Sequence, residues 1–336
     1  MTILSVAYPL LSVGPDSGGG AEQILHLLER GLVRHGCRSI VVAARGSQIS
    51  GELIETPAAE GEITEEVRQS ARRDQLRCIE QALKRYPIDL IHFHGLDFYE
   101  YLPVSQVRKL ATLHLPPAWY PHGIFDFEDV QLNCVSESQA NAVPSNKKLP
   151  VVLNGIDTER YRSGSREKKH LMWLGRICPE KGVHIGLQVA RQLDIPMVVA
   201  GPVHPFHDHE MYFTQQVEPL LDAQRRYVGS VGLDQKRALF AEAKCVLIPT
   251  LVAETSSLVA MEAISCGTPV VAFRSGALPE VVEDGVTGFI VDSQEEMAEA
   301  VRRIRNISPD TCRQQAKIRF DASRMVDDYI KLYESL

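Results

Sequence analysis

Short apolar segments alternate with segments of helical periodicity along the whole chain, and this alternation restricts the possible folds more than any other feature. Runs such as SIVVAA (39–44) are apolar at almost every position, as strands are when helices cover both faces of a parallel sheet. The sequence therefore predicts an α/β protein with doubly wound parallel sheets. We expect strands at 2–8, 39–44, 90–95, 110–115, 132–136, 171–175, 196–201, 245–250, 268–273 and 288–292, and early helices at 21–36 and 62–87.

The length of the chain indicates more than one domain. A chain of 336 residues is long for a single hydrophobic core, which favours two domains of similar size. A polar stretch at 145–170, SNKKLPVVLNGIDTERYRSGSREKKH, separates two α/β halves. We therefore predict two Rossmann-like domains, 1–149 and 150–317, that face each other across a cleft at the carboxyl ends of their sheets.

Composition excludes several classes of function. A net charge of −7 argues against nucleic acid as the main partner. The seven cysteines show no paired spacing, which is typical of reduced thiols in a cytoplasmic protein. The run at 2–8 has no basic start, so we interpret it as a buried strand and not as part of a signal peptide. The sequence contains no apolar run of the roughly 18 residues that stable membrane insertion requires.

The stretch AETSSLVAMEAISCGTPVVAF (253–273) carries the first candidate site. A helix is expected to begin near Ser256 or Ser257, because serine is a good N-cap. The amides of the first turn, at Ser257, Leu258 and Val259, would then be free to bind phosphate. Glu254 before the helix and Glu262 inside it can accept hydrogen bonds from hydroxyl groups, such as those of a sugar and a ribose. The alternative is a capped helix with one exposed glutamate.

The segment WLGRICPEKGVHIGL (173–187) carries two cations at the turn between a predicted strand and a helix. Arg176 follows the strand, and Lys181 lies just inside the helix. At the same sheet edge as Glu254, the two cations would neutralise a diphosphate. Elsewhere, an arginine and a lysine five residues apart would more often be solvated surface side chains.

Three glycines, Gly18, Gly19 and Gly20, directly precede the first predicted helix. Their backbone can approach a ligand closely. The segment lacks the third glycine of the dinucleotide-binding fingerprint, because Gln23 stands in its place. By themselves, the three glycines indicate only a flexible turn.

Histidines end two of the predicted strands, His92 and His94 in one and His114 in another. A histidine at the end of a strand is more often a structural hydrogen-bonding residue than a ligand-binding one. The run HPFHDHE (204–210) fits no common zinc spacing, so we expect no metal there. The sequence has no D-x-D pair, which argues against a metal-bridged diphosphate.

Taken together, these motifs resemble the retaining glycosyltransferases of family 4, which have the GT-B fold. The resemblance rests on E-x7-E followed by AISCGTPVVAF, on GRICPEKG, on NGID (154–157), on GGGAE and on ALPEVVEDGVTGFIV (278–291), in the order of the family and over nearly the whole chain. It implies a hexosyltransferase that moves a sugar from a UDP- or GDP-sugar to an acceptor hydroxyl, with retention and without a metal ion or other cofactor. The acceptor would be a small molecule, a glycan or a lipid-linked molecule.

The resemblance also implies roles for individual residues. The first domain would bind the acceptor and the second the donor, and the last helix (about 318–336) would pack back on the first domain. Arg176 and Lys181 would hold the diphosphate, Glu254 the sugar hydroxyls and Glu262 the ribose. The remaining donor contacts would be the amides at Ser257, Leu258 and Val259 for the distal phosphate, His114 for the sugar, and Gly19 and Gly20 where the first domain meets the donor.

One departure from the family concerns the residues after Glu254. The family commonly has x-F-G there, whereas this chain has Thr255, Ser256 and Ser257, and this polar loop leaves the donor sugar open. Two alternatives also remain: a nucleotide-sugar epimerase or hydrolase of the same fold, and a non-catalytic nucleotide-sugar sensor. The presence of Arg176, Lys181 and Glu254 disfavours the sensor.

Overall fold

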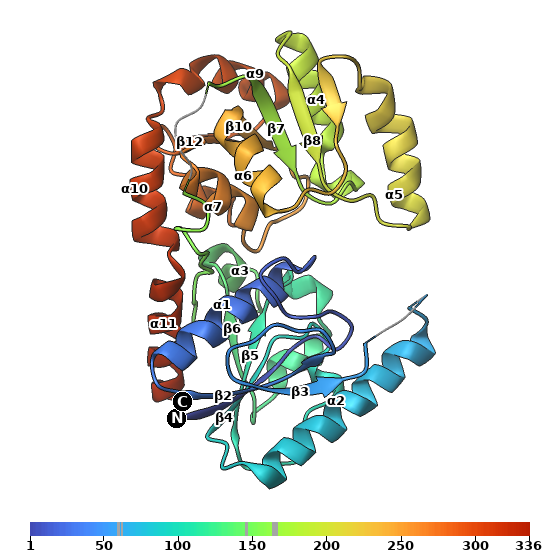
Figure 1. Cartoon of the computed structure of the whole chain (residues 1–336), viewed down its shortest axis with the longest axis vertical. Coiled ribbons are helices and arrows are strands. Elements are labelled where there is room, and N and C mark those ends of the chain that lie inside the picture. The colour runs from blue at the N-terminus through green and yellow to red at the C-terminus, as the bar shows by residue number, and fades with distance from the viewer. Residues whose placement is uncertain (59–60, 62, 145–146, 163–166) are drawn as a thin grey trace. The chain divides into compact units, whose positions relative to one another are not determined.

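The chain divides into two compact units. The structure, a computed structural model, describes residues 1–336 except 59–60, 62, 145–146 and 163–166 (Figure 1). One unit consists of Met1–Gly155 together with Ala322–Leu336, and the other of Ile156–Asp321. The division thus comes a few residues after the expected boundary at 149/150. Parts of the polar stretch at 145–170, and residue 62 at the expected start of a helix, lie outside the described residues.

The first unit contains a six-stranded parallel sheet with the strand order β3-β2-β1-β4-β5-β6. This is the order of a doubly wound dinucleotide-binding fold. Helices α1 (Gly20–Arg34) and α2 (Glu65–Arg85) lie on opposite faces of the sheet (Figure 1). The strands are β1 (Thr2–Val6), β2 (Arg38–Ala44), β3 (Glu52–Thr56), β4 (Leu90–Phe93), β5 (Arg108–Leu113) and β6 (Gln131–Cys134).

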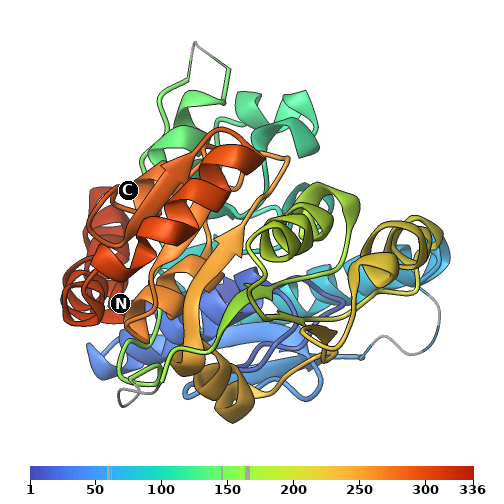
Figure 2. The same ribbon diagram turned by 90° about the horizontal axis from the view of Figure 1, so that it is seen from above.

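The second unit repeats this topology. Its six-stranded sheet has the order β12-β11-β10-β7-β8-β9, so that β7 and β10 take the central places that β1 and β4 take in the first sheet. Helices α4 (Val183–Gln192) and α9 (Gln294–Arg303) contact each other over the sheet (Figure 2). The strands are β7 (His170–Leu174), β8 (Met197–Ala200), β9 (Arg225–Tyr227), β10 (Ala243–Ile248), β11 (Val270–Phe273) and β12 (Gly288–Val291).

The predicted fold class of parallel, doubly wound sheets is confirmed, and each predicted strand overlaps a strand of the structure. The sequence pattern missed β3 and β9. Their sequences, ELIET and RRY, are polar and partly exposed, because each strand lies at the edge of its sheet. An edge strand has only one neighbouring strand and less cover, so it needs no apolar run.

The C-terminal helix belongs to the first unit. Helix α10 (Pro309–Phe320) ends in the second unit, and α11 (Ala322–Ser335) packs on α1. A Cβ atom at Gly31 of α1 would lie 2.2 Å from a methyl carbon of Val326, so only glycine allows this close approach. The hydroxyl groups of Tyr329 and Tyr333 lie near the first sheet, where they bond Thr112 and His92.

The remaining helices follow the alternation expected of an α/β chain. They are α3 (Glu137–Asn141), α5 (His207–Tyr212), α6 (Leu233–Glu242), α7 (Leu258–Ser265) and α8 (Leu278–Val281). Among all helices of the described residues, none is both long and apolar enough to cross a membrane.

Candidate functional site

The candidate site of the second unit lies where the strand order of its sheet reverses, between β7 and β10. In doubly wound sheets, ligands bind at the carboxyl ends of the strands at this point. One loop follows β7 (175–182) and another follows β10 (249–257). The backbone carbonyl of Glu180 in the first loop accepts hydrogen bonds from the Leu251 amide (2.8 Å) and the Thr250 hydroxyl (3.2 Å) in the second. The fold therefore joins the two segments that the sequence analysis singled out.

Lys181 and Glu254 form an ion pair across these two loops. The Lys181 Nζ atom lies 2.5 Å from Glu254 Oε1, and both side chains are largely buried. The close approach depends on Gly182, whose φ is 64° and where a Cβ atom would lie 2.1 Å from the Pro249 carbonyl oxygen. A lysine ammonium has three donors, so this pair leaves Lys181 able to bind an anion as well.

Helix α7 begins directly after the Glu254 loop. Ser257 is its N-cap, and the serine hydroxyl accepts a hydrogen bond of 3.4 Å from the Ala260 amide. The helix start thus agrees with the predicted one. The amides of Leu258 and Val259 lie in the first turn, where no intrahelical acceptor exists. Together with the helix dipole, they make this end of α7 suited to bind a phosphate.

Glu262, inside α7, is buried and already has two partners within the protein. The Tyr161 hydroxyl donates to its Oε1 atom at 2.6 Å, and Lys236 Nζ of α6 donates to the same atom at 2.9 Å. In the described part of the chain, Oε2 has no hydrogen-bond partner and is not among the fully buried polar atoms. Glu262 is therefore a fixed carboxylate with one oxygen available to a ligand.

Tyr161 is held as a neutral donor in this arrangement. Burial and the neighbouring Glu262 carboxylate raise the pKa of its hydroxyl well above the usual value. Arg176, in contrast, is exposed directly after β7. The edge of the second sheet thus combines an exposed arginine, a lysine, the start of a helix and two carboxylates. Such a set binds an anion and accepts hydrogen bonds from neighbouring hydroxyl groups.

The first unit has its candidate residues at the carboxyl ends of β4 and β5. His94 Nδ1 lies 3.1 Å from Nε2 of the partly buried His114, and the two rings are stacked with centroids 5.4 Å apart. Burial lowers the pKa of His114 to about 4. His114 is therefore a neutral imidazole at neutral pH, able to bind through a hydrogen bond but not through a charge.

His92 takes the structural role that is common for histidines at strand ends. It is fully buried, and its ring nitrogens bond the Thr112 hydroxyl (2.7 Å) and the Tyr333 hydroxyl (2.8 Å). Thr112 continues the network by donating to Asn133 Oδ1 at 2.7 Å. This buried network connects the first sheet to α11.

The glycine loop leads into α1 as expected, with Gly19 as the N-cap. The carboxylate of Glu22 is buried within the first turn, and burial raises its pKa. A Cβ atom at Gly19 would lie 1.9 Å from Glu22 Oε2, so a larger residue at this position would displace the Glu22 carboxylate. Gly20 is the first residue of the helix.

The structure brings most of the predicted residues of the second half together at one sheet edge and leaves the others in the first unit. The sequence analysis missed Tyr161 and Lys236, which hold Glu262. Neither residue belongs to a motif, because Tyr161 and Lys236 meet Glu262 only through the fold. The edge group contains Arg176, Lys181, Glu254, Ser257, Leu258, Val259 and Glu262, whereas His114, Gly19 and Gly20 belong to the first unit.

Two family models match the chain, and together they cover most of its length. The model described as "Glycosyl transferases group 1" matches residues 168–306, and "Glycosyltransferase Family 4" matches residues 18–160. The first match contains the whole group at the edge of the second sheet. The second contains the glycine loop and His114.

Two curated relatives bear the names of sugar-transferring enzymes. A lipopolysaccharide 1,2-N-acetylglucosaminetransferase of Salmonella typhimurium is 27% identical over 227 residues, which are 60% of this chain and 58% of the relative. A D-inositol 3-phosphate glycosyltransferase of Saccharomonospora viridis is 29% identical over 54% of this chain and 49% of its own length. The chain thus spans about half the length of the curated relatives it matches.

Solved structures share the fold over the whole chain. AviGT4, a glycosyltransferase involved in avilamycin A biosynthesis, aligns with a TM-score of 0.77 at 22% identity, over 100% of this chain and 98% of its own. HepE of Anabaena, solved in complex with UDP and glucose, aligns with a TM-score of 0.77 at 20% identity over all of both chains. These structural neighbours confirm the predicted GT-B fold.

Proposed function

Because the chain belongs to the group 1 glycosyltransferases, we propose that it is a retaining hexosyltransferase that moves a sugar from a UDP- or GDP-sugar to an acceptor hydroxyl. The observation that carries the proposal is the Lys181–Glu254 ion pair beside the N-terminal end of α7. It joins a cation for a diphosphate and a carboxylate for a polyol within one small region. The UDP and glucose in the HepE structure and the names of the relatives support a nucleotide-sugar donor.

The second unit offers more binding groups for the diphosphate than for any other part of the donor. Lys181 and Arg176 supply two positive charges, and the first-turn amides of Leu258 and Val259, with Ser257 at the cap, supply donors for the distal phosphate. The negative charge on the leaving diphosphate grows as the glycosidic bond breaks. Cations and dipoles that are already in place stabilise this charge more than that of the ground state.

The donor has hydroxyl groups on both sides of its diphosphate, on the sugar and on the ribose, and each side has a carboxylate that can accept hydrogen bonds from them. Glu254 accepts from the donor sugar, and its pairing with Lys181 keeps the carboxylate in one position. Glu262 accepts from the ribose through Oε2, because Oε1 is occupied by Tyr161 and Lys236. Fixed acceptors select for a sugar hydroxyl, since an analogue that lacks the hydroxyl leaves a polar group unpaired.

We further propose that the transfer retains the anomeric configuration and uses no metal ion or other cofactor. Arg176 and Lys181 take the role that a divalent cation has in enzymes with a D-x-D pair. For His114, Gly19 and Gly20 the proposed role is contact with the donor sugar, as the family resemblance implies. A neutral His114 suits this role, because it can hydrogen-bond a hydroxyl without adding a charge.

The proposed acceptor is a small molecule, a glycan or a lipid-linked molecule, and a net charge of −7 disfavours nucleic acid. All seven cysteines are free thiols, which supports a reducing, cytoplasmic location.

A panel of UDP- and GDP-sugars tests the function. Each donor is incubated with the purified chain, and thermal stabilisation and release of the nucleotide diphosphate are measured, without and with candidate acceptors. One donor is expected to raise the melting temperature and to be hydrolysed slowly, and an acceptor is expected to accelerate its turnover. If a donor raises the melting temperature but no diphosphate is released under any condition, the chain is a sensor and the proposal is wrong.

A further inference from the structure

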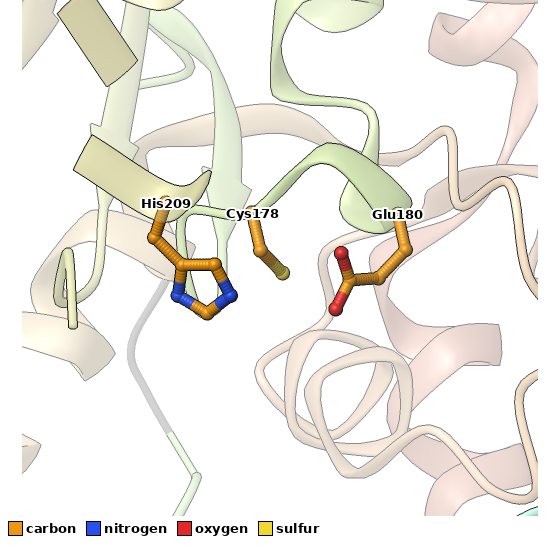
Figure 3. A group of neighbouring side chains, drawn as sticks. All are labelled: Cys178, Glu180 and His209. Atoms are coloured by element: carbon orange, nitrogen blue, oxygen red, sulfur yellow. The ribbon is translucent and has the colours of Figure 1, made fainter. Parts of the chain in front are cut away.

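A cysteine and a glutamate of the β7 loop (175–182) meet a histidine of α5, and none of the three belongs to the group described above. The ligand atoms of Cys178, Glu180 and His209 all lie within 4.8 Å of one another (Figure 3). The Cys178 sulfur lies between the imidazole ring and the carboxylate in this view. Cys178 is buried, and the other two side chains are partly buried.

The three side chains come from two segments that the fold holds in place. Cys178 is the N-cap of a short 3-10 helix, Pro179–Lys181, which contains Glu180. The Glu180 carbonyl is anchored to the β10 loop by the bonds from Thr250 and Leu251. His209 belongs to α5, and its amide bonds the Phe206 carbonyl at 2.9 Å.

The imidazole ring of His209 turns one nitrogen toward the other two side chains. In Figure 3 this nitrogen is Nε2, which faces the Cys178 sulfur. Nδ1, which among the described residues is a buried nitrogen without a hydrogen bond, lies on the other side of the ring. The ring also makes an edge-to-face contact with Phe206, with centroids 5.2 Å apart. Nε2 is therefore the atom of His209 that can bind an ion together with Cys178 and Glu180.

The donor set matches the preferences of one class of metal. Thiolate sulfur, imidazole nitrogen and carboxylate oxygen are the ligands of Zn²⁺, at bond lengths that give tetrahedral ligand–ligand distances of about 3.4–3.6 Å. The present limit of 4.8 Å exceeds these by about 1 Å, which small side-chain rotations can remove. Mg²⁺ and Ca²⁺ prefer oxygen ligands only and do not fit a set with sulfur and imidazole.

We propose that Cys178, Glu180 and His209 bind a Zn²⁺ ion, with water in the fourth position. A thiolate and a carboxylate would balance the charge of the ion, and the metal would tie the β7 loop to α5. The expectation that the 204–210 run binds no metal rested on the spacing within that run. His209 instead finds its partners in another loop, so spacing within its own segment could not reveal the site. The ion takes no part in the proposed metal-free sugar transfer, although two of its ligands lie in the same loop as Arg176 and Lys181.

A reactive cysteine is the main alternative for this group. The Cys178 side chain is buried, and its thiol donates a hydrogen bond of 3.5 Å to the Arg176 carbonyl. Reactive and redox-sensing cysteines are instead at least partly exposed to solvent. A metal ion can displace the proton from a thiol, whereas oxidants need the free thiolate.

The test measures Zn²⁺ binding by the untagged full-length chain, first stripped with a chelator. Calorimetry is expected to show one Zn²⁺ per chain in the wild type, and Co²⁺ is expected to give a thiolate charge-transfer absorption band. The variants C178S and H209A should each weaken Zn²⁺ binding at least about 10-fold, since even loss of an outer contact to a metal ligand costs that much. C178S should also lose the Co²⁺ band.

Matched controls separate the metal from effects on folding. His207 is exposed and lies two residues from His209 on the same helix, and H207A should bind Zn²⁺ as the wild type does. Melting temperatures are recorded with chelator and with Zn²⁺. The ion should raise the melting temperature of the wild type and of H207A, but not that of H209A. If H209A does not fold, E180Q gives the same comparison. The proposal is overturned if the wild type binds no Zn²⁺, or if C178S and H209A (or E180Q) bind it as tightly.

Discussion

Removal of the Lys236 ammonium is the most direct test of how Glu262 is held. In Lys236→Met the apolar stem is kept, but Glu262 loses a hydrogen bond of 2.9 Å and its charge partner, while its side chain is only 4% exposed. Breaking a buried ion pair by removing one partner typically costs about 3–5 kcal/mol. Tyr161 still donates to the carboxylate, so the lower end, about 3 kcal/mol, is expected.

The assay is urea unfolding of the second unit. Trp173 is buried in the core of this unit, whereas Trp119, the other tryptophan, is 58% exposed in the first unit. In a Trp119→Phe background, fluorescence therefore reports on the second unit. For a unit of this size a loss of about 3 kcal/mol corresponds to a fall in melting temperature of about 6–12 °C.

A double variant isolates the electrostatic part of this loss. Adding Glu262→Gln to Lys236→Met removes the uncompensated charge, so more than half of the lost stability is expected to return. Lys317→Met is the control, because the Lys317 side chain is 74% exposed and its ion pair with Glu159 is 3.9 Å long; such surface pairs are worth about 0–1 kcal/mol. If Lys236→Met unfolds like the control, or if the double variant is less stable than the single one, the buried pair does not hold Glu262 as we infer.

Three further predictions concern catalysis, metals and pH. Arg176→Ala and Lys181→Ala are each expected to lower turnover about 10²-fold or more, the scale for removing one charge-stabilising group; turnover within a few-fold of wild type in either variant would contradict their assignment to the diphosphate. Transfer should persist after exhaustive EDTA treatment, which also empties the proposed zinc site; activity that vanishes and returns with Mg²⁺ or Mn²⁺ would show that the diphosphate needs a metal. Burial lowers the pKa of His92, His94 and His114, so below pH about 6.5 the unfolded state binds protons that the folded state does not, and the free energy of unfolding falls as the pH drops, by at most about 1.4 kcal/mol per histidine and pH unit. Urea unfolding between pH 7 and 5 should show a shallower slope in His114→Asn, and equal slopes would refute a depressed pKa for this histidine.

The sequence by itself determined the fold class and the central strands of both sheets. A strand with helices on both faces, such as β2 or β11, must be apolar throughout, and this local requirement is visible in the residues. The start of α7 was also predictable, because Ser257 satisfies helix amides only a few residues away. Where strands needed no apolar run, as in β3 and β9 at the sheet edges, the pattern gave no signal.

Only the tertiary structure decided which distant side chains meet. Lys236 and Tyr161 meet Glu262, and His209 meets Cys178, because the order of the parallel strands brings loops from separate βα units to one edge. Nothing in the spacing of these residues along the chain specifies that meeting. Partners within one turn or one helix can be read from local sequence, whereas partners that contact each other across a sheet edge depend on strand order and register, which every residue of the fold helps to set.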